Sequence, residues 1–121
     1  MVSSVHCQSR IYGGQGGYMK AVKSFSELQR MILENKCLLV YLSSPGCSVC
    51  YADMPKVEKL AEEMRFPSVH IDISEVPEAS GQLIVFTAPA VLLFYRNKEY
   101  HREVRIIDFS VLKKRMMELP D

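Results

Sequence analysis

Apolar positions along the chain change their period several times, and each change indicates a new secondary-structure element. Residues 37–42 and 91–95 are apolar almost throughout, as in buried strands, whereas residues 68–72 alternate apolar with polar side chains. Elsewhere apolar residues recur every three or four positions, as on one face of a helix. In chain order the pattern predicts a helix over 25–34, a strand over 37–42, a helix over about 48–64, a strand over 68–72, a short helix over 77–83, a strand over 91–95, a returning strand over 100–105 and a final helix after Asp108.

Cap and turn residues mark the ends of these elements. Ser24 and Glu27 stand at capping-box spacing, and Asp108 is a good N-cap residue. Pro77 suits the first turn of the short helix, where its missing N–H is not needed. Residues 96–99 are interpreted as the turn of an antiparallel hairpin. Strand–helix units followed by a hairpin and a helix predict an α/β fold with a mixed central β-sheet flanked by helices.

Length and composition favour one domain with a short extension. The chain has 121 residues, which is enough for one hydrophobic core and too few for two. Residues 1–18 hold four of the six glycines and offer little to bury. We therefore expect a flexible, glycine-rich extension over residues 1–18 and one folded domain over residues 19–121.

Charge and hydropathy exclude several classes of partner. The net charge is +1, and neither the basic nor the acidic residues form a long block, so we expect no nucleic-acid or membrane surface. No apolar stretch has the length of a signal peptide or a membrane span. Four cysteines in a chain of this size do not make a disulfide framework. We expect a cytoplasmic monomer in a reducing compartment, with proteins or small thiols as partners.

The candidate chemistry is concentrated in Cys47-Ser48-Val49-Cys50, which lies between a predicted strand and a predicted helix. The nucleophile of thiol chemistry is the thiolate, and the free N–H groups and positive dipole end of a helix stabilise that anion. A free cysteine has a pKa of about 8.5, and a helix N-terminus lowers it to about 3.5–7.5. The segment is therefore a candidate redox site with Cys47 as the nucleophile.

A zinc site is the main alternative for the cysteine pair. Zinc sites of the structural type take four ligands, but the sequence holds no second Cys-x-x-Cys and no His-x-x-x-His. Cys37 opens an apolar strand and is interpreted as a small buried hydrophobe, and Cys7 as an exposed thiol without a role. We expect no metal.

Three further motifs follow the cysteine pair. Pro55 lies eight residues after Cys47, residues 72–78 read Asp-Ile-Ser-Glu-Val-Pro-Glu, and Thr87-Ala88-Pro89 precedes an apolar strand. In this order they resemble the helix-kinking proline, the Asp-x-Asp-x-x-Pro stretch and the cis-proline loop of the thioredoxin family. The match covers roughly residues 20–119. The resemblance implies a thioredoxin-like fold and a thiol-disulfide oxidoreductase.

The resemblance also implies a mechanism for the cysteine pair. Cys47 attacks a disulfide in a client protein, and Cys50 resolves the resulting mixed disulfide. The product is a Cys47–Cys50 disulfide, the only cofactor we expect, which an electron-donor reductase must reduce again. Ser48 and Val49 replace the Gly-Pro that the family commonly carries, so they are expected to tune the reduction potential.

A second part of the resemblance concerns substrate binding. A cis Ala88–Pro89 bond exposes the backbone of Ala88 for pairing with an extended substrate, with Thr87 just outside. Gly46 stands where the family usually has a tryptophan, and Arg105 where it has a glycine that lines the groove. We expect both at the substrate surface, although Arg105 is equally well explained as an exposed charge on an edge strand.

Two departures from the family concern proton transfer. Tyr41 stands where the family buries an aspartate, and His70 where it has a partner lysine. Both are candidates for a proton relay to the cysteines. A phenol with a pKa of about 10 is a poor base at neutral pH. For His70 a half-buried place in the strand is the favoured explanation, because one histidine on an alternating strand needs no function. Packing is also an alternative for Tyr41.

Two functions remain open at this point. The preferred one is a protein-disulfide reductase that acts through Cys47 and Cys50. The alternative is a binding module with little turnover, which holds a partner at the Ala88–Pro89 edge, and a weaker third possibility is metal transfer through the cysteine pair. The binding module predicts that the cysteines have ordinary thiol pKa values and that partner binding survives Cys47→Ser.

Overall fold

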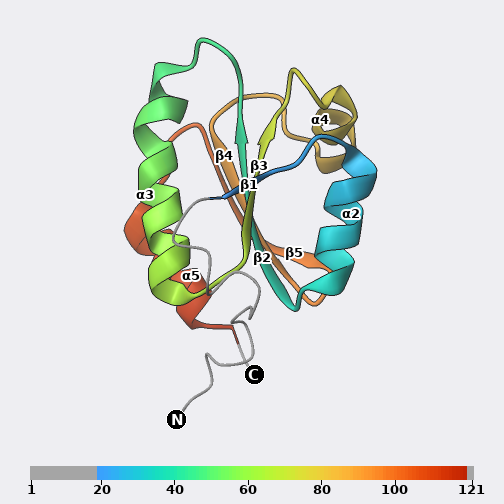
Figure 1. Cartoon of the computed structure of the whole chain (residues 1–121). Helices are drawn as coiled ribbons and strands as arrows, with labels where there is room; N and C mark the ends of the chain where they lie inside the picture. The colour runs from blue at the N-terminus through green and yellow to red at the C-terminus, as the bar shows by residue number, and fades with distance from the viewer. Residues whose placement is uncertain (1–18, 120–121) are drawn as a thin grey trace.

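The computed structural model describes residues 19–119. They form a five-stranded sheet in the order β1-β3-β2-β4-β5 with helices on both faces (Figure 1). The elements in chain order are β1 (Lys20–Ala21), α2 (Phe25–Glu34), β2 (Cys37–Ser43), α3 (Ser48–Met64), β3 (Ser68–Asp72), α4 (Pro77–Leu83), β4 (Ala90–Tyr95), β5 (Lys98–Val104) and α5 (Phe109–Met117). The predicted α/β fold is confirmed. The extension expected over residues 1–18 lies outside the described residues.

Two features of the sheet differ from the sequence prediction. The sequence does not predict β1, because two residues are too few to show a period. The turn between β4 and β5 is shorter than expected, because Tyr95 already pairs with Lys98. Arg96 and Asn97 form it with φ angles of 51° and 71°, the left-handed pair whose twist matches that of the flanking strands.

β2 is the central strand, and all seven of its residues are buried. It runs parallel to β3, with Ser43 opposite Asp72, and antiparallel to β4, with Leu42 opposite Ala90. A strand buried on both faces reads as a continuous apolar run, which is why the sequence pattern predicts it.

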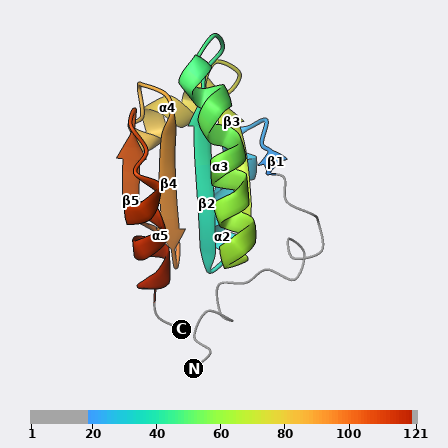
Figure 2. The ribbon, with the colours of Figure 1, turned by 90° about the vertical axis from the view of Figure 1, so that its left-hand side faces the viewer.

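Alternate residues of β2 enter two separate cores. In Figures 1 and 2, α3 and α5 cover one face of the sheet, and α2 and α4 cover the other. Leu39 and Tyr41 pack on the α3 and α5 side. Leu38, Val40 and Leu42 pack on the α2 and α4 side. Each fully buried large apolar side chain contributes roughly 1.5–3 kcal/mol, so both cores stabilise the sheet.

α3 is amphipathic and contains Pro55, as the family resemblance implies. It ends at Arg65, whose left-handed backbone (φ 57°, ψ 40°) lets its N–H reach the carbonyls of Ala61 and Glu62. No helix within residues 19–119 combines the length and hydropathy needed to cross a membrane.

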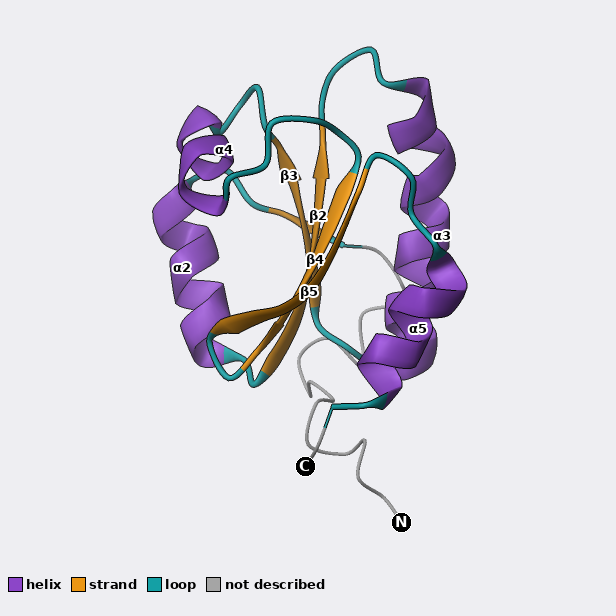
Figure 3. Ribbon diagram, turned by 180° about the vertical axis from the view of Figure 1, so that it is seen from behind, coloured by secondary structure: helices purple, strands orange, loops and turns teal. Residues whose placement is uncertain are grey.

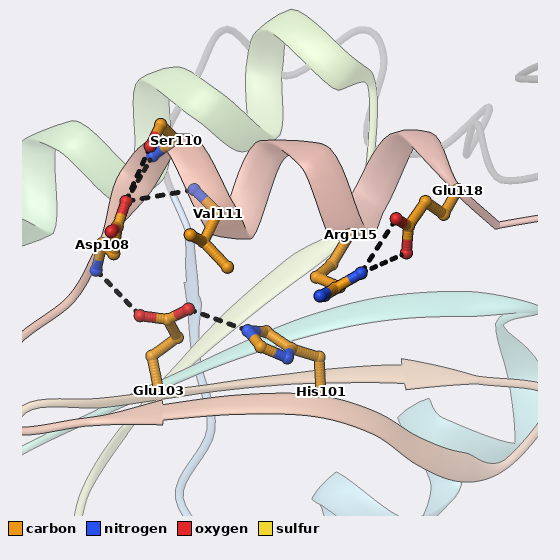
Figure 4. A network of polar contacts seen from close by, with 7 residues as sticks. All are labelled: His101, Glu103, Asp108, Ser110, Val111, Arg115 and Glu118. Carbon is orange, nitrogen blue, oxygen red and sulfur yellow. Dashed lines mark hydrogen bonds and ion pairs between the residues drawn. The ribbon is translucent and has the colours of Figure 1, made fainter.

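Glu103 fastens the start of α5 to β5 (Figure 4). Its carboxylate makes one hydrogen bond to Nε2 of His101 and accepts another from the N–H of Asp108, each at 2.8 Å. Asp108 is the predicted N-cap, and its side chain accepts from the N–H groups of Ser110 and Val111. These bonds fix the path of the chain where it leaves β5.

Helix α2 begins at the predicted N-cap, with one difference from a capping box. The hydroxyl of Ser24 accepts from the N–H of Glu27 at 3.1 Å, as expected. The Glu27 carboxylate reaches back one residue further than predicted, to the N–H of Lys23. That bond, with the nearby Lys20 ammonium, holds the pKa of Glu27 below its usual value.

Four strand ends that bear on the chemistry meet at one end of the sheet. The register places the carboxyl ends of β2, β3 and β5 beside the amino end of β4. Figure 3 shows the loops that connect the strands to α3 and α4 at this end. The cysteine pair follows β2 here.

Candidate active site

The cysteine pair lies where β2 ends and α3 begins. Cys47 is the N-cap of α3, with an extended backbone (φ −94°, ψ 101°), and Cys50 lies in the first turn. A disulfide joins their side chains across a Cα–Cα distance of 5.2 Å. Cys47 is partly exposed, whereas Cys50 is 1% exposed. A substrate therefore reaches Cys47 first.

The start of α3 favours negative charge on Cys47. Its sulfur accepts a hydrogen bond of 3.1 Å from the backbone N–H of Cys50. The first turn of the helix carries no acidic residue that would oppose this charge. Ser48 and Val49, the two residues between the cysteines, are both exposed. The unpaired N–H groups and the dipole at this end are suited to hold a thiolate.

Gly46 gives the chain its turn into the cysteine pair. Its φ is +73°, a left-handed conformation that side chains with a Cβ rarely adopt. A Cβ at this position would meet no atom within 4 Å, so the constraint is the backbone angle and not space. Gly46 and Pro45 are both exposed next to Cys47.

Tyr41 contacts the main chain of Cys50. The ring is fully buried, and its hydroxyl donates a hydrogen bond of 2.8 Å to the Cys50 carbonyl. Burial, and to a lesser degree the Asp53 carboxylate, raises the pKa of Tyr41 well above its usual value. The phenol therefore keeps its proton near neutral pH.

His70 lies beside Tyr41 in the register of β2 and β3, with 6.0 Å between the ring centroids. Its Nε2 is 2.6 Å from the hydroxyl of Ser43. Burial lowers the pKa of His70, and the Asp72 carboxylate partly opposes that shift. The hydrogen bonds of these two rings thus reach the Cys50 carbonyl and the Ser43 hydroxyl. Their role as a proton relay stays a prediction.

The Ala88–Pro89 peptide bond is cis. Because Ala90 pairs with Leu42, Pro89 lies at the level where β2 ends and the chain turns toward Cys47. Thr87 is exposed and Ala88 is half-buried. The predicted substrate edge and the predicted nucleophile therefore share one end of the sheet.

Arg105, which directly follows β5, lies at the same end of the sheet. Its N–H donates a hydrogen bond of 2.7 Å to the Pro89 carbonyl. Its φ is 73°, which is the conformation that a glycine adopts most easily, and its side chain is exposed. The backbone geometry of this position is thus the one that suits the family's glycine, although the side chain is a cation.

Sequence reasoning missed two residues that shape the site. Ser43 holds His70, and Arg102 donates to the carbonyls of Leu83 and Ile84 just before the cis-proline loop. Neither has a local sequence signal, because both act on residues far away in the chain. Within residues 19–119, no group of three or more His, Cys, Asp or Glu side chains is placed to hold a metal ion.

Comparisons with known proteins agree with this geometry. The family model described as Thioredoxin matches residues 19–117. The thioredoxin-like protein YdfQ of Bacillus subtilis is 33% identical over 101 residues, which cover 81% of this chain and 88% of YdfQ. Among solved structures, a mutant thioredoxin of Halobacterium salinarum superimposes with a TM-score of 0.78 at 23% identity, covering 86% of this chain and 92% of that one. Thioredoxin of Fasciola hepatica gives a TM-score of 0.75 at 23% identity, over 84% of this chain and 100% of that one. Fold, cysteine pair and sequence together show that the chain belongs to the thioredoxin family, with a role in thiol-disulfide redox chemistry.

Proposed function

We propose that the protein reduces disulfides in client proteins, with Cys47 as the nucleophile and Cys50 as the resolving thiol. The observation that carries the proposal is the Cys47–Cys50 disulfide at the start of α3, with one cysteine accessible and the other buried. This asymmetry supports a two-step exchange in which the accessible sulfur meets the client and the buried one completes the reaction.

In the first step the Cys47 thiolate attacks one sulfur of the client disulfide. A bond forms between Cys47 and that sulfur, the client S–S bond breaks, and the second client sulfur leaves as a thiolate. The positive end of α3 and the N–H of Cys50 support the thiolate form of Cys47 before the attack.

In the second step the Cys50 thiolate attacks the sulfur of Cys47. The bond between Cys47 and the client sulfur breaks, that sulfur leaves as a thiolate, and the Cys47–Cys50 disulfide forms. The client gains two electrons and two protons, and the cysteine pair loses them. Tyr41 does not accept the Cys50 proton in this scheme, because its pKa is raised and its hydroxyl donates to the Cys50 carbonyl. Tyr41 instead holds the backbone that carries the resolving cysteine.

The client is expected to dock as an extended segment along Ala88. Ala88 is half-buried and precedes the cis-proline, and in this proposal its backbone provides one N–H and one carbonyl for a strand-like partner. Gly46, Thr87 and Arg105 border this surface in the proposal, and the Arg105 cation favours clients with acidic residues near the disulfide. Ser48 and Val49 tune the potential, because both lie in the helix turn that stabilises the thiolate.

The cycle requires an electron donor and no bound cofactor other than the disulfide itself. A dithiol or a reductase must return two electrons to the Cys47–Cys50 pair after each turnover. The sequence further predicts that the protein is a monomer, that it acts in the cytoplasm, and that it has no nucleic-acid or membrane partner.

Insulin reduction with dithiothreitol as donor tests the proposal. Wild type should accelerate the reduction, and Cys47→Ser should reduce the rate to that of dithiothreitol alone. Equal rates for wild type and variant would rule out the reductase function and favour the binding module at the Ala88–Pro89 edge. In that case, capture of an extended peptide should survive Cys47→Ser.

A further inference from the structure

Arg102 of β5 and Arg105, which directly follows β5, bind the two ends of the segment that carries the cis-proline. At one end the N–H of Arg105 donates to the Pro89 carbonyl at 2.7 Å. At the other end the Arg102 guanidinium donates through Nη2 to the Leu83 carbonyl at 2.8 Å and through Nη1 to the Ile84 carbonyl at 2.9 Å. The segment from Ile84 to Pro89 is therefore bound at both ends by residues at the carboxyl-terminal part of β5 or directly after it.

The end of α4 needs such an anchor. Its C-cap residue Ile84 has φ 56° and ψ 54°, a left-handed conformation that a β-branched residue rarely adopts. Ile84 is 68% exposed, so side-chain packing contributes little to holding this conformation. The last turn of α4 contains no basic residue of its own. Arg102 supplies the missing cation at the negative end of the helix and binds its terminal carbonyls.

A β-bulge in β5 brings Glu99 next to Arg102. Arg102 pairs with Leu92 and Glu99 pairs with Phe94, and the register shifts between Leu93 and Phe94. Residues three apart normally point to opposite faces of a strand, but here both partners on β4 belong to one core cluster, so Glu99 and Arg102 share a face. The Glu99 carboxylate accepts from Nε of Arg102 at 2.6 Å and from Nη2 at 2.7 Å.

All three nitrogens of the Arg102 guanidinium therefore donate hydrogen bonds. Nε and Nη2 bind the carboxylate of Glu99, while Nη1 and Nη2 bind the two carbonyls at the end of α4. A lysine carries the same charge but lacks the planar set of donors that spans three acceptor groups.

We propose that Arg102 is a positioning residue for client docking, which holds the segment from Ile84 to Pro89 in the geometry that an extended substrate needs. Arg102 acts through this segment and does not contact the reacting sulfurs. The inference rests on the proposed reductase function and adds the residue that sets its substrate affinity. Loss of the fork should thus weaken the docking of a protein client and leave the chemistry of Cys47 unchanged.

Two substrates separate docking from chemistry. Insulin must dock along the segment, whereas cystamine is too small to use it. We would compare wild type, Arg102→Lys and Arg102→Gln, all confirmed as folded by circular dichroism at the assay temperature. Arg115→Gln is the matched control, because Arg115 also forms an ion pair with a glutamate three residues away, Glu118, but on α5.

Both Arg102 variants should raise the KM for insulin by about tenfold, with kcat and the cystamine rate within about twofold of wild type. The control should match wild type.

Two results would overturn the proposal: a KM for insulin within about twofold of wild type in both Arg102 variants, or a cystamine rate that falls in step with the insulin rate. If wild type reduces neither substrate, the reductase function itself fails. Amide hydrogen exchange over residues 84–89 then decides the role of Arg102. If these amides exchange about tenfold faster in Arg102→Gln than in Arg115→Gln, Arg102 holds the segment as proposed. Equal exchange rates in the two variants contradict that role.

Discussion

The face of the sheet under α2 and α4 and the face under α3 and α5 are built from the same strands but differ in their polar content. On the first face, Leu38, Val40 and Leu42 from β2 enter an apolar core. On the second face, Tyr41 and its neighbour His70 make hydrogen bonds close to the disulfide. One strand, by the alternation of its side chains, therefore supports both a hydrophobic core and a reactive site.

The difference indicates how stability and chemistry are divided in this fold. Buried polar groups are costly unless they are hydrogen-bonded, and on the α3 side the hydroxyl of Ser68 is buried without a protein partner. The β2 residues on the α2 side are Leu38, Val40 and Leu42, and none of these side chains carries a polar group that burial would leave without a partner. We therefore expect substitutions on the α2 side to change mainly the free energy of unfolding, and substitutions on the α3 side to report on the site.

The largest effect is expected from Leu38→Ala on the apolar face. Leu38 is fully buried, so the variant should lose about 3 kcal/mol of unfolding free energy through lost burial and a residual cavity. Urea unfolding with the disulfide intact measures this loss. The reaction of the reduced variant with cystamine should remain within about twofold of wild type. A tenfold slower reaction would show that the two faces are not separable.

On the polar face, Tyr41→Phe should cost about 1–2 kcal/mol, because the Cys50 carbonyl loses its buried donor. Tyr100→Phe is the matched control, since its hydroxyl binds Glu118 at the surface and its loss should stay within about 0.5 kcal/mol. Insulin reduction by Tyr41→Phe near neutral pH should persist, because a phenol with a raised pKa is no base there. A complete loss of activity with retained stability would instead make Tyr41 part of the proton relay.

The two structurally described glycines sharpen the comparison at the site entrance. A Cβ meets no atom within 4 Å at either Gly46 or Gly81, but only Gly46 has a positive φ, of +73°. Gly46→Ala should therefore lose about 1 kcal/mol, and Gly81→Ala, within α4, should gain about 0.5–1 kcal/mol. Urea midpoints measure both changes, and equal signs for the two variants would contradict the backbone argument.

The smallest effect is a pH dependence that arises from His70. Burial lowers the pKa of His70 below 6.5, so as the pH falls through 6.5 the unfolded chain takes up a proton that the folded protein does not. Stability should therefore decrease as the pH falls from 7 through 6.5 toward the lower pKa of the folded state. His70→Gln should flatten this part of the urea-midpoint profile. Identical slopes in wild type and variant would exclude His70 as the cause.

Much of the fold can be predicted from the sequence, because its signals are local. The continuous apolar run of β2 and the cap residues Ser24 and Asp108 each act within a few positions of the chain. The two-residue strand β1 depends on pairing with Val69 and His70, far away in the chain, so local patterns do not predict it. The turn at Arg96 and Asn97 is predicted two residues too long, because the pattern does not show that Tyr95 and Lys98 already pair.

The same distinction applies to the site. The cysteine pair and the cis-proline are recognisable as motifs, since each is a short run of residues. Arg102 is not recognisable, because its role depends on a bulge in β5 that brings Glu99 to its side and on carbonyls of a distant helix. Tyr41 was a candidate for proton transfer, but its bond to the Cys50 carbonyl is visible only in three dimensions.

Trapping of the mixed disulfide tests the central claim most directly. Cys50→Ser and Cys47→Ser, both fully reduced, are incubated with excess insulin, and the adducts are mapped to individual cysteines by peptide mass spectrometry. The account predicts that Cys50→Ser accumulates an adduct on Cys47 that dithiothreitol releases, and that Cys47→Ser accumulates none on Cys50. An equal adduct on Cys50 in the Cys47→Ser variant, or no adduct on Cys47 in the Cys50→Ser variant, would contradict the assignment of Cys47 as the nucleophile.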